Sequence, residues 1–126
     1  MPRLSLDTNL PASKIPEDFL GTCTSLLSKN LGKRQSYCVA TVNPGVKMTL
    51  GGSNDPCGFI QITSIGSLGP EENPKHMEVI TDYMHQTLGI PKERLLINLQ
   101  ANIQATTGYL GTTFHELFTV EKGKRL

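Results

Sequence analysis

The sequence predicts an α/β fold in which a β-α-β unit occurs twice in tandem. Short segments of alternating or mostly apolar residues, typical of strands, flank two longer segments whose apolar residues recur at helical spacing. Each helical segment ends at a Leu-Gly pair, Leu31-Gly32 and then Leu88-Gly89, and the strand-like segments that begin near Cys38 and Leu95 keep the same offset. At 126 residues, 37% of them hydrophobic, the chain fits one domain with one core.

The first unit begins almost at the N-terminus. Residues 3–7 alternate between polar and apolar side chains, which predicts a strand with one buried face. In the helix that follows, we expect Pro16 in the first turn, where proline is well tolerated and where the two acidic residues behind it suit the helix dipole. Residues 37–42 are the second strand. The apolar stripe of the helix consists of Phe19, Leu20, Cys23, Leu26, Leu27 and Leu31.

The second unit repeats this order. Residues 59–63 are predicted to form its first strand, and Asn73-Pro74 has the residue types of a helix start, with Asn73 as the N-cap. Leu95–Leu99 is predicted to be its last strand. The helix between them carries the apolar stripe Met77, Ile80, Tyr83, Met84 and Leu88.

Two β-α-β units of this kind predict one four-stranded mixed sheet with both helices on one face. The other face is then left uncovered, although Leu95–Leu99 is apolar at nearly every position, as in strands that are buried on both sides. We therefore expect subunits to pack their uncovered sheet faces together. The alternative, a free apolar surface on a monomer, would be an unusually large patch.

The charge pattern excludes several classes of partner. The formal net charge is +1 and the basic residues are scattered, so nucleic acid and anionic membrane surfaces are not expected partners. No apolar run approaches the ~20 residues of a membrane span, and no secretory signal pattern opens the chain, so we expect synthesis in the cytosol. The three histidines do not form a one-face pair on a helix, so no metal site is expected.

The three cysteines, Cys23, Cys38 and Cys57, are widely spaced and odd in number, which favours reduced thiols over a disulfide framework. We interpret at least Cys23 and Cys38 as small core residues.

The N-terminus carries a candidate catalytic group. Initiator methionine is generally removed before a residue as small as proline, which would leave Pro2 with a free secondary amine. Because a strand begins directly behind it, that amine would be held at the end of a sheet. The alternative is that proline occupies the second position by chance.

Several short motifs, in order, resemble one family. They are Met1-Pro2, Thr8-Asn9-Leu10-Pro11, Leu31-Gly32-Lys33, Gly51-Gly52-Ser53, Ser64-Ile65-Gly66 and Gly111-Thr112-Thr113-Phe114. Together they are similar to the macrophage migration inhibitory factor family of the tautomerase superfamily. The resemblance implies a tautomerase domain over residues 1–115, assembled as a homotrimer with active sites between subunits. Residues 116–126 extend past the usual end of the family. The alternatives there are a segment that adjusts the oligomer and a disordered tail, and we expect the disordered tail.

The resemblance also implies a reaction, keto-enol tautomerisation of phenylpyruvate- or dopachrome-type compounds, without a cofactor. Pro2 would be the general base, which works best when its pKa lies near ambient pH. Burial and the ammonium of Lys33 would both disfavour the protonated amine. Lys33 and the backbone amide of Ile65 would bind the substrate, with Lys33 stabilising the developing enolate oxygen. Asn98 would complete the pocket from a neighbouring subunit.

Some positions depart from the family pattern. Leu96 stands where well-known members carry a tyrosine, Arg3 replaces an apolar residue, and Thr107 and Tyr109 replace valine and tryptophan. Cys57 lacks the second cysteine of a C-x-x-C motif because Ile60 stands there, so thiol oxidoreductase activity is not expected.

The predicted function is therefore a tautomerase acting on a small aromatic ketoacid. The resemblance adds a cytokine-like, immune-modulating role with a cell-surface receptor as partner, for a protein that is cytoplasmic and also secreted without a signal peptide. One alternative is a catalytically impaired receptor-binding homologue. Another is an intracellular enzyme with no signalling role.

Overall fold

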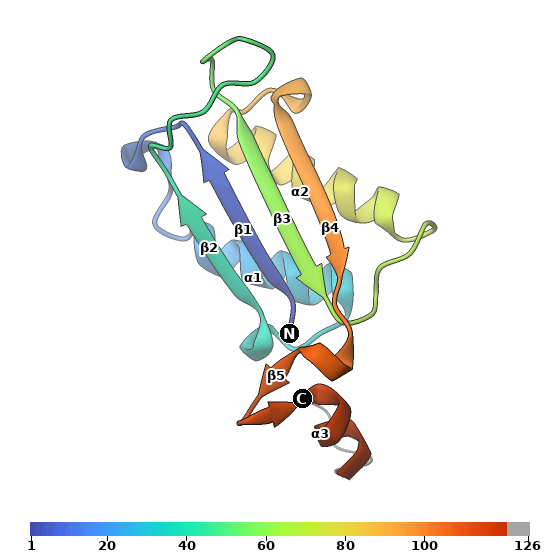
Figure 1. Ribbon diagram of the computed structural model, residues 1–126. Helices are drawn as coiled ribbons and strands as arrows, with labels where there is room; N and C mark the ends of the chain where they lie inside the picture. Colours follow the sequence, from blue (N-terminus) through green and yellow to red (C-terminus); the bar gives the residue numbers. More distant parts are fainter. Residues whose placement is uncertain (121–126) are drawn as a thin grey trace.

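Four strands form one mixed sheet in the order β2-β1-β3-β4 (Figure 1). The computed structural model describes residues 1–120. The strands are β1 (Arg3–Thr8), β2 (Val39–Asn43), β3 (Gly58–Ser64) and β4 (Leu95–Ala101); the main helices are α1 (Phe19–Leu31) and α2 (Asn73–Leu88). A two-stranded hairpin, β5 (Gly108–Tyr109) and β6 (Thr112–Thr113), precedes helix α3 (Phe114–Val120). Short 3-10 turns occupy Ala12–Lys14, Gln35–Tyr37, Lys92–Arg94 and Gln104–Thr106.

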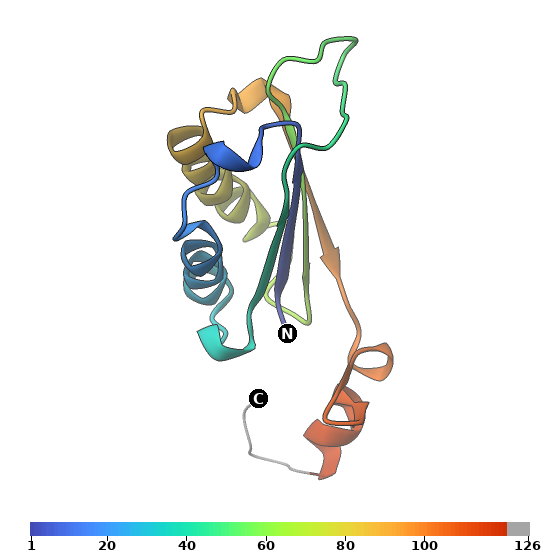
Figure 2. The ribbon, with the colours of Figure 1, turned by 90° about the vertical axis from the view of Figure 1, so that its left-hand side faces the viewer.

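The predicted tandem arrangement is confirmed. Strands β1 and β2 are parallel neighbours connected by α1, and strands β3 and β4 are parallel neighbours connected by α2. The two units join where β1 pairs with β3 in the antiparallel direction. Both helices lie on the same side of the sheet (Figure 2). Each helix ends at the predicted glycine, Gly32 with φ 65° and Gly89 with φ 73°, because a left-handed residue lets the chain leave the helix.

The core lies between the sheet and the two helices. Leu4 and Leu6 of β1 and Ile60 of β3 have no exposed surface, as their alternation predicted. Side chains of the predicted helical stripes cover them: Phe19, Cys23, Leu27, Leu31, Ile80, Met84 and Leu88 are all buried. The periodicity that predicts the elements therefore also predicts most of the buried face. The prediction is wrong at Leu20, which belongs to the predicted stripe of α1 but exposes 40% of its surface.

Two element starts differ from the prediction. Helix α1 begins at Phe19 rather than at Pro16, because residues 16–19 form a separate turn closed by the Phe19 N–H and the Pro16 carbonyl (3.1 Å). Strand β2 begins at Val39, after a 3-10 turn that occupies Gln35–Tyr37.

Asn73 is the first residue of α2 rather than its N-cap. Its side-chain oxygen accepts a hydrogen bond from the Gly69 N–H at 3.0 Å, so it organises the loop before the helix.

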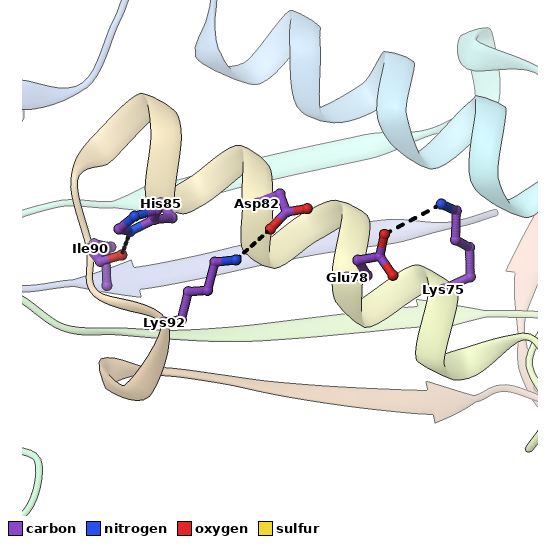
Figure 3. Close-up of polar contacts among 6 residues, drawn as sticks. All are labelled: Lys75, Glu78, Asp82, His85, Ile90 and Lys92. Atoms are coloured by element: carbon purple, nitrogen blue, oxygen red, sulfur yellow. Dashed lines mark hydrogen bonds and ion pairs between the residues drawn. The ribbon is translucent and has the colours of Figure 1, made fainter.

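Two ion pairs and one histidine contact lie on the exposed side of α2 (Figure 3). Lys92 lies 3.0 Å from Asp82, and Lys75 lies 3.6 Å from Glu78. The Nδ1 atom of His85 lies 2.9 Å from the Ile90 carbonyl oxygen. Exposed pairs of this kind contribute only ~0–1 kcal/mol each, so the buried face holds the helix in place.

The uncovered sheet face is mixed rather than uniformly apolar. Val39, Phe59 and Leu96 expose 40%, 40% and 54% of their surface there. Polar side chains alternate with them, and a hollow of about 210 Å³ is lined by Arg3, Ser5, Asp7, Phe59, Gln61 and Thr63. Within one chain, Leu95–Leu99 is therefore covered only on its helix-facing side. This agrees with the expectation that its other side needs a second subunit to cover it.

The expected extension from residue 116 is partly helical. Helix α3 runs through Glu116 to Val120, so the expected disorder is wrong for these residues, and 121–126 lie outside the described residues. Phe114 and Leu117 expose only 2% and 8% of their surface, which explains why the helix forms. The hairpin and α3 project beyond the end of the sheet at which β1 begins (Figure 1).

The guanidinium of Arg94 holds the loop formed by residues 44–57. It donates hydrogen bonds to the carbonyl oxygens of Leu50 (3.2 Å) and of Ser53, Asp55 and Pro56 (3.0 Å each). Only arginine presents enough donors in a planar fork to reach several carbonyls at once. One side chain therefore organises most of this loop.

We expect Arg94→Lys to lower the free energy of unfolding by about 1–3 kcal/mol, because several carbonyls lose their donor. Amides of residues 50–57 should also exchange hydrogen faster. Urea unfolding and hydrogen exchange measure the two effects. Arg34→Lys, at an exposed position, is the matched control. Equal stability of the two variants would contradict the role given to Arg94.

Candidate active site

A pocket of about 470 Å³ opens at the N-terminal end of β1. It is lined by Met1, Pro2, Lys33, Tyr37, Ile65, Gly66, Gln104, Phe114 and Phe118. The lining comes from the chain start, the end of α1, the turn before β2, the loop after β3 and the C-terminal segment. Three of the four predicted site residues, Pro2, Lys33 and Ile65, therefore meet in one pocket.

Pro2 is fixed by the sheet that follows it. Its side chain is fully buried, and its carbonyl oxygen accepts a hydrogen bond of 2.9 Å from the Val39 N–H of β2. Arg3, the next residue, begins the ladder with β2 and β3. A chain start is usually mobile, but here the parallel and antiparallel neighbours of β1 hold it.

The α-amine at this chain start has a lowered pKa. Burial lowers the pKa of the Met1 α-amine below its ordinary value of 8.0, and the nearby Lys33 ammonium lowers it further, whereas Cys38 acts in the opposite direction. Both lowering causes act by disfavouring the protonated amine. An amine at this position can thus be neutral, and so basic, near physiological pH. While Met1 is present, however, the Pro2 nitrogen is an amide and not a base.

Lys33 is positioned by the end of α1. Gly32 adopts the left-handed conformation, and the Gly32 and Lys33 N–H groups both donate to the Ser28 carbonyl. The Ser28 hydroxyl in turn donates to the Lys33 carbonyl. This capping leaves Lys33 half-buried at the pocket, with its backbone fixed.

The Ile65 loop is built from a tight turn after β3. The buried Ser64 hydroxyl donates to the Gly66 carbonyl at 2.9 Å. Gly66 and then Ser67 have positive φ values of 76° and 63°, a conformation that is strained for serine. Such a turn holds Ile65, which lines the pocket, in a defined position.

Ser67 joins the two loops of the site. Its hydroxyl donates to the Leu31 carbonyl at 2.7 Å, two residues before Lys33, and its own carbonyl lies 2.9 Å from Nε2 of the buried His76. The segments that carry Ile65 and Lys33 are thereby held together. Sequence reasoning did not find Ser67; its position directly behind Ser64-Ile65-Gly66 was the only signal.

The pocket also has an aromatic side. Tyr37, Phe114 and Phe118 line it, and Tyr109 contacts the rings of Tyr37 and Phe114 without lining it. Phe114 appeared in the sequence only as part of a motif, and Phe118 carried no signal at all.

Asn98 lies elsewhere in the single chain. It is exposed on β4, paired with Gln61 of β3, on the uncovered sheet face. It does not line the pocket of its own chain, so its place in an active site stays a prediction that needs a second subunit.

A larger cavity, of about 520 Å³, lies beside the 44–57 loop. It is lined by Asn9, Val46, Lys47, Met48, Thr49 and Asn54, and so offers Lys47 as its only ionisable side chain. The acid-base chemistry therefore points to the Pro2 pocket. Within residues 1–120, no three His, Cys, Asp or Glu side chains gather in a way that could hold a metal ion.

Comparison with known proteins agrees with this geometry. The sequence model of one family, described as macrophage migration inhibitory factor (MIF), matches residues 1–115. This chain belongs to that family. Its fold is that of the tautomerase superfamily to which the family belongs.

The match with each of the following relatives covers nearly the whole length of that relative. The MIF homolog of Trichuris trichiura is 38% identical over 114 residues, which are 90% of this chain and 100% of that protein. The mouse protein is 33% identical over 114 residues, 90% of this chain and 99% of that one. The solved structure of the Trichinella spiralis MIF superposes with a TM-score of 0.87 at 34% identity, covering 89% of this chain and 99% of that one.

Proposed function

We propose that this protein catalyses keto-enol tautomerisation of a phenylpyruvate- or dopachrome-type compound, with the α-amine of Pro2 as general base after removal of Met1. The observation that carries the proposal is the meeting of a buried chain start, a half-buried lysine and an aromatic wall in one pocket. Membership of the MIF family supports the same class of reaction.

The reaction needs one proton transfer from carbon. The neutral amine removes a proton from the carbon beside the carbonyl, and the electron pair moves onto the carbonyl oxygen to give an enolate. Lys33 and the Ile65 backbone N–H hold the carboxylate and the developing oxygen charge. Protonation of that oxygen completes the enol, and the reverse steps restore the ketone. No cofactor is needed, because the amine both accepts and returns the proton.

We further propose a homotrimer in which Asn98 reaches the pocket of a neighbouring subunit. The uncovered sheet face of each chain, with Phe59 and Leu96 exposed, supports subunit packing.

The family also suggests a cytokine-like role outside the cell, with release without a signal peptide and a cell-surface receptor as partner. Detection of the protein in medium around intact cells would separate this role from that of a purely intracellular enzyme. None of the helices described between residues 1 and 120 could cross a membrane.

The alternative is a receptor-binding homologue with an impaired pocket. It would follow from the departures at Leu96 and Arg3. Arg3, however, is exposed on the uncovered sheet face and does not line the Pro2 pocket, so it leaves the chain's own share of the site intact.

A native mass spectrum paired with a phenylpyruvate tautomerase assay tests the proposal. We expect a subunit mass that lacks methionine, a trimer, and a rate well above the uncatalysed one. Loss of Met1 without activity would instead favour the receptor-binding alternative.

A further inference from the structure

A row of aromatic rings leads from the 3-10 turn before β2 to the C-terminal helix. The ring centroids of Tyr37 and Tyr109 are 5.9 Å apart, those of Tyr109 and Phe114 are 6.0 Å apart, and those of Phe114 and Phe118 are 5.7 Å apart. These separations are typical of favourable aromatic pairs. Each ring therefore helps to hold the next one in position.

Phe118, the last ring of this row, lies outside the part of the chain that matches the family. The match ends at residue 115, yet Phe118 lines the same pocket as Pro2 and Lys33. Leu117 beside it is buried, and Phe114 lies one helical turn before it on the same helix. The helix is thus anchored by two buried residues, and Phe118 is left half-buried at the pocket.

We propose that Phe118 is a specificity-determining residue of this site, which stacks on the aryl group of an aromatic ketoacid. The inference rests on the proposed tautomerase function and names the substrate class of the same pocket. The polar side of the pocket, Lys33 and the Ile65 amide, takes the carboxylate end. The opposite, apolar end of the substrate then meets rings from Tyr37, Phe114 and Phe118.

The size of the pocket agrees with this arrangement. A volume of about 470 Å³ is within the range of small-molecule sites, which is about 300–1,000 Å³. A small alkyl ketoacid would bind Lys33 in the same way but leave the aromatic side unfilled. Selectivity between aryl and alkyl ketoacids should therefore depend on α3, while the proton transfer itself should not.

A fluorescence experiment tests the contact without relying on turnover. The chain contains no tryptophan, so Phe118→Trp introduces a single reporter. We expect phenylpyruvate to change the emission of this variant in a saturable manner. Glu116→Trp, at an exposed position of the same helix, is the control for light absorbed by the ligand itself. Equal responses of the two variants would overturn the proposal.

Kinetics provide the second test. For Phe118→Ala we expect KM for phenylpyruvate to rise about three- to tenfold with little change in kcat, and KM for a small alkyl ketoacid to stay the same. Phe118→Leu, which keeps apolar bulk but no ring, should resemble the alanine variant. An unchanged KM ratio in both variants would overturn the proposal. If turnover is absent even in the unmodified protein, the tautomerase function fails, and the fluorescence result still decides the binding role of Phe118.

Discussion

Replacing Pro2 by glycine is expected to lower kcat/KM for phenylpyruvate by about 10²- to 10⁴-fold, the usual contribution of a positioned general base. Glycine would still provide an α-amine, but it lacks the proline ring, which is buried directly before the first residue of β1. The nitrogen would then rotate freely and be better hydrated, so it would be misplaced relative to the substrate. The decay of enol absorbance measures the rate.

Two companion variants isolate the role of the amine. Insertion of one alanine between Met1 and Pro2 keeps the ring but makes its nitrogen an amide, so we expect a loss at least as large as in Pro2→Gly. Pro11→Gly, at an exposed proline beyond the other end of β1, should leave the rate unchanged. Full activity of the inserted variant would show that another group is the base.

The main elements could be predicted because their signals are local. The alternation around Leu4 and Leu6 requires only that one side of β1 be buried, and both side chains are fully buried. The Leu-Gly pairs mark helix ends because glycine tolerates the left-handed conformation that Gly32 and Gly89 adopt. Such features depend on neighbouring residues, and the sequence displays neighbours directly.

The C-terminal segment could not be predicted in the same way. Strands β5 and β6 have two residues each, too few to show any alternation. Helix α3 depends on burial of Phe114 and Leu117 and on ring contacts with Tyr109, which come from the fold rather than from local propensity. Helix propensity alone is a weak guide for so short a segment.

The site residues show the same difference between local signals, which the sequence displays, and contacts that only the fold creates. Pro2, Lys33 and Ile65 were found through motifs, and the structure brings them into one pocket. The hydrogen bond from Ser67 to Leu31 was missed, because it joins residues that are far apart in the chain. Asn98 remains a prediction, since its proposed contact lies across a subunit boundary that a single chain does not contain.

Replacing Lys33 by glutamine is expected to have two effects on the same reaction. It removes the cation that would bind the substrate and stabilise the enolate, so kcat/KM should fall by about 10²-fold. It also removes a positive charge that lowers the pKa of the α-amine. Lys29→Gln, at an exposed position in the last turn of α1, should have neither effect.

The pH profile separates these two effects. The base must be unprotonated, so kcat/KM should rise with pH through the pKa of the Pro2 amine. Burial and Lys33 lower the pKa of the Met1 α-amine at this chain start, and we expect both causes to act on the Pro2 amine in the same direction. Without the Lys33 charge the amine keeps its proton to higher pH, and the profile of Lys33→Gln should move in the alkaline direction. Lys33→Arg keeps the charge and should leave the profile nearly in place. A profile that stays fixed in Lys33→Gln, while kcat/KM falls, would restrict Lys33 to substrate binding and leave the lowered pKa to burial alone.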